Sequence, residues 1–368
     1  MRRSCDAAAL ARPGVREIKP YQPGKPIEEL ERELGIANAI KLASNENPFG
    51  PSPLALAALR AQSGDIARYP DANGFALKKA LAARFGVPMA SVTLGNGSND
   101  VLDLVARVFA GPGDEVVYAQ HGFLVYPLVA RAVGATPVEV PARDWGHNLE
   151  AMARAVTTRS RVVYVANPNN PTGTYSTEPA LRAFLDALPD TVVCVVDEAY
   201  FEYVAAADYP DATRWLERYP NLVVTRTFSK IYGLAGLRIG YGVSSPAIGD
   251  LLNRVRQPFN TSSVAQEAAL VALDDDEHVR RSRERNASEL RRLDEGMRAL
   301  GLNTIPSVGN FLTVDLKRPA APVYEAMLRQ GVIVRPIANY GMPNHLRFTV
   351  GHAEDNERAL DALRRALA

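Results

Sequence analysis

Short apolar runs alternate with longer amphipathic stretches through the middle of the chain. The apolar runs are four to six residues long and rich in Val, which is typical of strands that are buried on both faces. We expect strands at residues 116–119, 137–140, 162–166, 191–196, 222–225 and 238–243. The amphipathic stretches predict helices at residues 101–109, 126–133 and 178–187. Strands and helices in this order predict an α/β fold with a mainly parallel sheet between helices.

The pattern changes after Gln266. A long helical pattern covers residues 276–300, and its apolar positions are Val279, Leu290, Leu293 and Met297. Shorter strands are expected at residues 311–315, 332–335 and 346–350, followed by a last helix at 354–367. We therefore predict a large domain (43–265), a smaller C-terminal α+β domain (266–368) and an N-terminal arm (1–42) that joins the small domain.

Composition and charge narrow the class of protein. The 368 residues are enough for two domains, and a net charge of +1 gives no electrostatic footprint for nucleic acid or an anionic membrane. The basic start of the chain precedes an apolar stretch that is too short for a signal sequence, and no run approaches the length of a membrane span. The two cysteines, Cys5 and Cys194, favour a reducing compartment. We expect a cytoplasmic protein without nucleic-acid or membrane partners.

Polar residues that follow strands are the first candidates for a site, because ligands of parallel sheets bind outside the C-terminal strand ends. Gly97, Ser98 and Asn99 precede a predicted helix, where glycine lets the backbone approach a ligand and free N–H groups favour an anion such as phosphate. Ser98 or Asn99 would cap that helix. In the segment 166–173, two prolines fix the backbone while amides such as Asn170 project. Each segment alone is also compatible with an ordinary turn.

Two ionisable residues have more specific settings. Asp197 ends an apolar strand, where an uncompensated carboxylate is costly, so we expect a cationic partner; Tyr200 follows three residues later. Lys230 follows Thr227 and Ser229 and is the only lysine between Lys79 and Lys317, in a chain with seven lysines and 35 arginines. A lysine in a chain that otherwise prefers arginine indicates an amine that must lose its proton. An anion cradle, an amine nucleophile, a carboxylate and an amide are together what pyridoxal 5′-phosphate (PLP) requires.

The series Asn170-Pro171-Thr172-Gly173, Asp197-x-x-Tyr200 and Ser229-Lys230 resembles the class I and II aminotransferases of PLP fold type I. The resemblance extends from Tyr21 to the last helix, and it implies a large domain with a seven-stranded sheet. The segments 44–50 (Ser-Asn-Glu-Asn-Pro-Phe-Gly) and 68–71 (Arg-Tyr-Pro-Asp) are similar to the histidinol-phosphate group of this family.

The resemblance also implies roles for single residues. Lys230 would hold the cofactor as a Schiff base and move a proton between Cα and C4′, while Asp197 would pair with the pyridine nitrogen. Asn170 and Tyr200 would bind the cofactor O3′, and Phe123, which follows His121 and Gly122, would stack on the ring. The implied phosphate-binding residues are Gly97, Ser98, Asn99, Thr227, Ser229 and Arg238. Tyr69 would reach the cofactor phosphate of a partner subunit, which implies a homodimer with shared sites. No metal is expected.

The implied substrate residues are Tyr21, Asn45, Arg335 and Arg347. In this family an arginine at the position of Arg347 binds the substrate carboxylate, and in the histidinol-phosphate group Arg335 and Tyr21 would help it to bind a phosphate. Two arginines suit a dianion better than one. The implied reaction is ping-pong: L-glutamate and imidazole-acetol phosphate give 2-oxoglutarate and L-histidinol phosphate, a step of histidine biosynthesis.

Three other functions are open to the same residues. An aromatic amino-acid aminotransferase would use the same scaffold, and a PLP-dependent decarboxylase or lyase of an amino-acid phosphate would use the same cofactor residues. A non-catalytic PLP-binding regulator would need a DNA-binding domain, and the segment before Ala43 is too short and too rich in proline for one.

Overall fold

Seven strands form the central sheet, as expected. The computed structural model describes residues 5–62, 64 and 66–368; the basic start of the predicted arm, residues 1–4, lies outside them. The strand order is β2-β8-β7-β6-β5-β3-β4, and β8 is antiparallel to both of its neighbours. The strands are β2 (Val92–Gly95), β3 (Glu115–Ala119), β4 (Thr136–Val140), β5 (Ser160–Ala166), β6 (Val193–Asp197), β7 (Leu222–Thr227) and β8 (Gly240–Ser244). The prediction of a mainly parallel sheet is confirmed.

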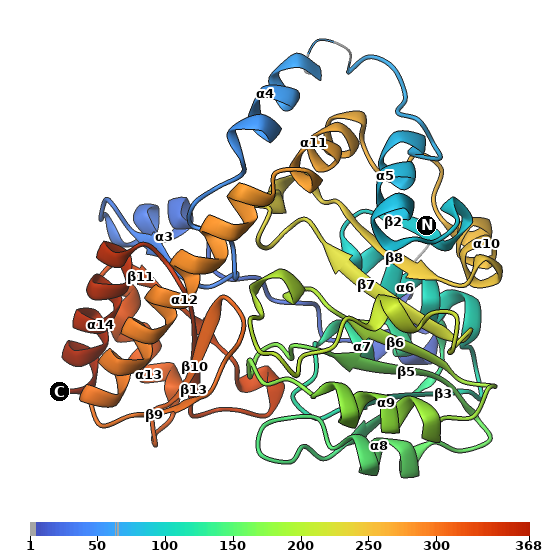
Figure 1. Ribbon diagram of the computed structural model, residues 1–368. Helices are drawn as coiled ribbons and strands as arrows, with labels where there is room; N and C mark the ends of the chain where they lie inside the picture. Colours follow the sequence, from blue (N-terminus) through green and yellow to red (C-terminus); the bar gives the residue numbers. More distant parts are fainter. Residues whose placement is uncertain (1–4, 63, 65) are drawn as a thin grey trace, which may run out of the picture.

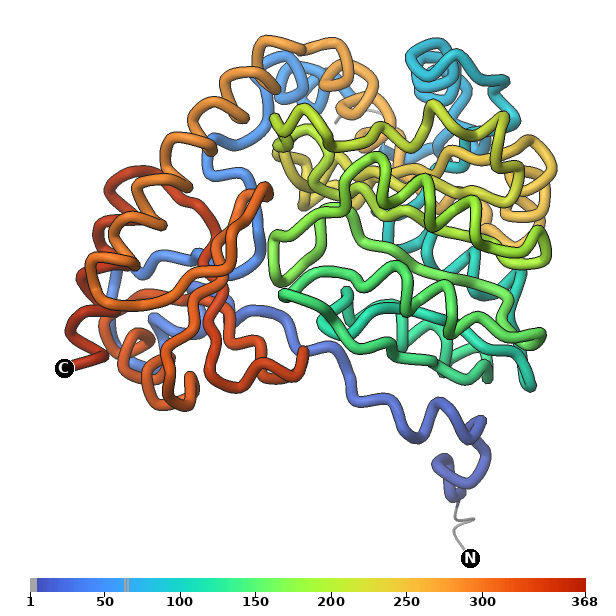
Figure 2. The backbone as a smooth tube through the Cα atoms, turned by 60° about the horizontal axis from the view of Figure 1, so that its bottom comes forward, coloured from blue at the N-terminus to red at the C-terminus, as the bar shows by residue number. Residues whose placement is uncertain are grey.

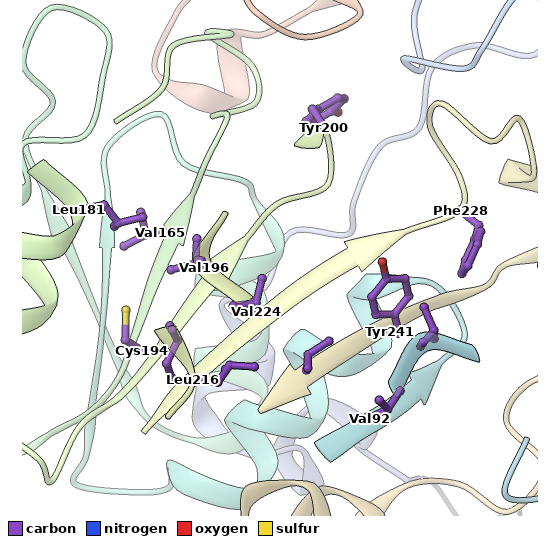
Figure 3. Close-up of a cluster of buried hydrophobic side chains, with 14 of the residues drawn as sticks. Val92, Val165, Leu181, Cys194, Val196, Tyr200, Leu216, Val224, Phe228 and Tyr241 are labelled. Atoms are coloured by element: carbon purple, nitrogen blue, oxygen red, sulfur yellow. The ribbon is translucent and has the colours of Figure 1, made fainter. Parts of the chain in front are cut away.

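Helices cover both faces of this sheet (Figure 1), and successive side chains of β3, β5, β6 and β7 alternate between two apolar cores. Val165, Val196 and Val224 project from neighbouring strands into the first core (Figure 3). That core is covered by α5 (Phe75–Phe85), α8 (Leu149–Ala155), α9 (Glu178–Ala187) and α11 (Ser263–Leu273), and α11 also packs on α4 (Pro53–Gln62). The second core is covered by α6 (Ser98–Phe109), α7 (Val125–Val133) and α10 (Pro246–Val255).

The C-terminal part has its own core and an antiparallel sheet of order β12-β13-β10-β9. Its strands are β9 (Asn303–Ile305), β10 (Phe311–Asp315), β12 (Arg335–Pro336) and β13 (His345–Thr349). Its helices are α12 (Asp276–Ala299), α13 (Ala320–Leu328) and α14 (Ala353–Leu367), and α12 runs from the large sheet unit to the small one (Figure 1). The division at residues 42 and 265 stays a prediction; α11, beyond that boundary, contributes to the first core of the large sheet.

The N-terminal segment contacts both parts. It contains α1 (Ala7–Leu10), α2 (Pro13–Arg16), α3 (Ile27–Leu34) and β1 (Ile40–Lys41), and β1 pairs in parallel with β11 (Val332–Ile333). At the other end of the segment, Gly14 lies directly against the backbone of Arg131 in α7. Figure 2 shows this blue segment extending from the small unit along the large one. None of the described helices is both long and apolar enough to cross a membrane.

The predicted bounds of two strands, 332–335 and 238–243, were wrong. The expected strand at 332–335 is split, because β11 pairs with β1 whereas β12 pairs with β13 in another sheet. The expected strand at 238–243 begins only at Gly240, because Arg238 takes a left-handed conformation with φ 53°. An arginine lies at each departure, Arg335 at the first and Arg238 at the second, and both arginines line the cavity described below.

A buried ion cluster joins β6 and β7 below the site. The Arg226 guanidinium donates to Glu198 at 2.9 Å and to Asp211 at 2.6 Å, and it lies 3.4 Å from the centre of the Phe201 ring. Glu198 is fully buried, and it also accepts the backbone N–H of Ala212. A charge in this setting is stable only while its partner is present.

We therefore expect Arg226→Met to lower the free energy of unfolding by roughly 3–5 kcal/mol, because it leaves the Glu198 carboxylate buried without a cation. Urea unfolding followed by circular dichroism measures this change. The matched control is Arg280→Met, which removes an exposed arginine that pairs with Glu277 and Glu284 and should lower the free energy of unfolding far less, because solvent screens those pairs. Equal losses in the two variants would contradict the role of the buried cluster.

Candidate active site

One cavity of about 460 Å³ lies where the C-terminal strand ends of the large sheet meet the small unit and the N-terminal segment. The strand register creates this edge, because Ala166 pairs with Asp197 and Asp197 pairs with Thr225. Of the residues predicted to form a site, fourteen line the cavity: Tyr21, Asn45, Ser98, Asn99, Phe123, Asn170, Asp197, Tyr200, Thr227, Ser229, Lys230, Arg238, Arg335 and Arg347. The fold thus brings together residues from distant parts of the sequence.

Lys230 follows β7 and presents the amine of the cavity. Its Nζ donates to the backbone oxygen of Ser44 at 3.3 Å and lies 5.5 Å from the centre of the Tyr200 ring. Burial lowers the pKa of Lys230 to about 8, and the positive charges of Arg347 and Arg238 act in the same direction. A substantial fraction of the amine is therefore neutral near pH 8 and can act as a nucleophile.

Asp197 is the last residue of β6, and its buried carboxylate faces the cavity. Thr225 donates to its Oδ1 at 2.9 Å, and Tyr126 donates to its Oδ2 at 2.9 Å. Burial raises the pKa of Asp197, while these two hydrogen bonds and the charge of Lys230 oppose the rise. Tyr126 was not among the predicted site residues, and its spacing of three residues from Phe123 is a weak signal that could have found it.

An anion cradle lies at the start of α6. The expectation that Ser98 or Asn99 caps this helix was wrong, because Gly97 is the N-cap residue and makes no side-chain cap. Ser98 and Asn99 are instead the first helical residues, whose N–H groups have no partner within a helix. Arg238 donates to Ser229 at 3.1 Å, and any side chain at Gly97 would collide with its guanidinium. Backbone N–H groups, hydroxyls and a guanidinium in one place suit a phosphate.

Asn45 and Asn170 connect the rest of the cavity through hydrogen bonds. The Asn45 amide donates to the Tyr200 hydroxyl at 2.9 Å, and burial raises the pKa of Tyr200 to about 12. Arg347 donates to the Asn170 side chain and to the backbone oxygen of Ala43, at 2.6 Å in the latter case. The Asn170 amide is therefore oriented by an arginine of the small unit.

Arg335 and Arg347 form a cross-strand pair, directly opposite each other on β12 and β13. Residues in register on antiparallel neighbours point to the same face, so both guanidiniums enter the cavity. Arg335 also donates to the backbone oxygen of Gln22 and lies 5.5 Å from the Tyr21 ring centre. Arg335 is 6% exposed and Arg347 is 5% exposed. Two buried positive charges side by side are costly, so an anion bound between them would be strongly stabilised.

Two predicted site residues do not line this cavity. Gly97 lies behind Arg238, as described above. Tyr69 is 82% exposed and stacks on Phe259 with ring centres 4.5 Å apart, beside a second surface pocket that Arg238 also lines. Within a single chain, Tyr69 therefore contributes to the outer surface next to the anion cradle.

The fold and this site define a transaminase, and comparison with known proteins agrees. Residues 37–363 match the model of the family "Aminotransferase class I and II", and the chain belongs to that family. It is 56% identical over 367 residues to histidinol-phosphate aminotransferase 2 of Pseudomonas fluorescens Pf-5, covering 99% of both chains. It is also 56% identical over 365 residues to histidinol-phosphate aminotransferase 2 of Pseudomonas aeruginosa, again with 99% coverage of both.

Solved structures give the same result. The chain superimposes on the histidinol-phosphate aminotransferase of Sinorhizobium meliloti, determined in complex with pyridoxal-5′-phosphate, with a TM-score of 0.89, 30% identity and 96% coverage of both chains. An aspartate aminotransferase of Thermus thermophilus matches with a TM-score of 0.86 at 24% identity, covering 97% of this chain and 99% of the other, and this likeness concerns the fold alone.

The lowered pKa of Lys230 leads to a pH prediction. A group that titrates near pH 8 instead of 10.5 loses its proton as the pH rises through 8, so the rate of PLP capture by the apoenzyme should rise from about pH 7 to about pH 9, with its midpoint near 8, and then level off. Stopped-flow absorbance of the bound cofactor measures this rate.

Lys230→Ala is the control for the same measurement. Burial also lowers the pKa of Lys78 to about 8, but Lys78 does not line the cavity. The variant should therefore form no covalent adduct at any pH, although a second lysine of similar pKa is still present. A normal adduct in Lys230→Ala, or a midpoint near 10.5 in the wild type, would contradict the assignment.

Proposed function

We propose that this protein is a histidinol-phosphate aminotransferase that uses PLP bound at Lys230 to exchange amino groups between L-glutamate and imidazole-acetol phosphate. The products would be 2-oxoglutarate and L-histidinol phosphate, in histidine biosynthesis. The observation that carries the substrate proposal is the cross-strand pair Arg335 and Arg347, which presents two cations to one substrate. Sequence identity of 56% over nearly the whole chain to enzymes of that name supports it.

The cavity fits the cofactor by its chemistry. The buried Asp197 carboxylate needs a cation, which a protonated pyridine nitrogen would provide, and the cradle at Ser98, Ser229 and Arg238 would hold the phosphate. Phe123 lines the same space and would offer a flat apolar surface to the ring, and Asn170 and Tyr200 would hydrogen-bond the ring hydroxyl. When bound, PLP supplies an electron sink for the electrons released at the substrate Cα.

Side chains of this protein would bind the substrate and transfer its proton. Arg347 and Arg335 bind the substrate anion, which fixes the direction in which the substrate amine enters. Lys230 Nζ, neutral for much of the time near pH 8, takes the proton from the substrate Cα and returns it later. Tyr21 lines the cavity beside Arg335, whose guanidinium lies 5.5 Å from the centre of its ring. Glutamate carries a second carboxylate, so the same arginine pair serves both substrates.

We propose that two copies of the chain form a homodimer with the active sites at the interface between the subunits. Six large apolar side chains are exposed in the N-terminal part of the large unit and beside the second pocket: Leu54, Leu56, Ile66, Tyr69, Phe75 and Phe259. Such a group of exposed apolar side chains is typical of a protein contact.

The proposed division into an arm, a large domain and a small domain fits the pairing of β1 with β11. Free Cys5 and buried Cys194 support a cytoplasmic location.

Arg335→Ala tests the substrate. It removes one of the two cations, so kcat/KM for histidinol phosphate in the half-reaction should fall roughly 10- to 100-fold, and that for phenylalanine and tyrosine should fall much less. Stopped-flow half-reaction kinetics measure all three. Arg292→Ala, which removes an exposed arginine outside the cavity, is the control and should change none of them. Equal losses for phosphate and aromatic substrates would favour the aromatic aminotransferase, and release of CO2 would favour the decarboxylase.

Subunit mixing tests the dimer and the role of Tyr69. A Lys230→Ala chain lacks the amine, and a Tyr69→Ala chain would lack the group that reaches the partner's cofactor phosphate. Mixed dimers of the two should each contain one complete site, so an equimolar mixture should recover about a quarter of the wild-type sites. Cofactor absorbance and activity of the refolded mixture measure the recovery. Activity no higher than the mean of the two separate variants would contradict shared sites.

A further inference from the structure

A phenol lies behind the carboxylate that faces the cavity. The Tyr126 hydroxyl donates to Asp197 Oδ2 at 2.9 Å, although Tyr126 is fully buried and does not line the cavity. Thr225 occupies the other carboxylate oxygen, Oδ1, also at 2.9 Å. The two donors come from different elements, one from α7 on a face of the sheet and one from the neighbouring strand β7, so each carboxylate oxygen has its own donor.

The Tyr126 hydroxyl can only donate in this position. Burial, followed by the negative charge of Asp197, raises its pKa well above the ordinary value, so it keeps its proton at any physiological pH. An ionised carboxylate is an acceptor alone, so the hydrogen bond favours the charged form of Asp197. Each carboxylate oxygen has a second lone pair, so capacity remains on the cavity side for one more donor.

The ring of Tyr126 is fixed by its neighbours. It stacks on Tyr164 with ring centres 4.7 Å apart and an angle of 2°, and it meets Phe123 edge to face at 6.0 Å and 87°. Tyr164 is also fully buried, but its hydroxyl donates to the backbone oxygen of Leu102 at 2.7 Å and does not contact Asp197. The chain therefore offers two adjacent buried tyrosines, of which one contacts the carboxylate.

We propose that Tyr126 is a positioning residue for cofactor binding: its hydroxyl holds the Asp197 carboxylate ionised and aimed at the ring nitrogen of the bound cofactor. This inference rests on the proposed function, because it takes PLP as the ligand of the cavity. Tyr126 acts through Asp197 and touches neither cofactor nor substrate. Removing the hydroxyl should weaken only the interaction that depends on the ring nitrogen.

The test compares PLP with its 1-deaza analogue, in which a C–H group replaces the ring nitrogen. Dissociation constants of both ligands are measured by equilibrium titration of the dimeric apoenzyme, for the wild type, Tyr126→Phe and Tyr164→Phe. The wild type should prefer PLP, and Tyr126→Phe should reduce that preference on the order of tenfold, as expected for one hydrogen bond to a charged group. Tyr164→Phe, the matched control, should keep the wild-type preference.

A double-mutant cycle separates the proposed role from a general loss of stability. In an Asp197→Asn background the carboxylate is absent, so adding Tyr126→Phe should leave the preference between the two ligands unchanged. If Tyr126→Phe weakens both ligands equally, or acts as strongly in the Asp197→Asn background, Tyr126 serves packing alone and the proposal is overturned. A wild type that binds neither ligand would instead contradict the proposed function.

A second variant keeps the test decisive if Tyr126→Phe does not fold. Site-specific 3-fluorotyrosine at position 126 retains the hydroxyl and makes it a stronger donor. The preference for PLP over the deaza analogue should then increase relative to the wild type. An unchanged or reduced preference would overturn the proposal.

Discussion

The buried carboxylate of Asp197 is the constraint on which the arrangement of the site depends. An ionised group at the end of an apolar strand is tolerated only with donors and a cation, and the fold supplies both kinds of partner. Thr225 comes from the neighbouring strand, Tyr126 comes from the helix that covers the sheet, and Lys230 follows the strand of Thr225. The register that places Asp197 opposite Thr225 therefore also determines where the amine can lie.

A second group of charges belongs to the small unit. Arg335 and Arg347 are opposite each other on short antiparallel strands, and hydrogen bonds to Gln22, Ala43 and Asn170 hold their guanidiniums. These partners lie in the N-terminal segment and the large unit, so the two arginines connect all three parts of the chain. A substrate anion that neutralises this pair would at the same time affect how the parts are held together.

Burial shifts the pKa values of Lys230 and Asp197 in opposite directions, and both shifts favour the neutral form. It lowers the pKa of the Lys230 amine and raises that of the Asp197 carboxylate, so each group in isolation tends toward its neutral form. For Lys230 the neutral form is the reactive one. For Asp197 the charged form is required, and the two hydroxyl donors directed at that carboxylate favour it.

The sequence by itself determined the class of fold and the chemistry of the site, because both depend on local signals. Short continuous apolar runs predict strands that are buried on both faces, and the ionisable residues at or just after their ends, Asp197 and Lys230 among them, stand out from those runs. Only the tertiary structure decided which backbone groups those residues meet. Tyr126 is an ordinary apolar position of a helix in the sequence, and its hydroxyl gains a role only when α7 packs over β3 and β4 and brings that hydroxyl to Asp197. In the same way, the split of residues 332–335 between two sheets, the left-handed turn at Arg238 and the position of Tyr69 on the outer surface depend on partners distant in sequence, which no local pattern specifies.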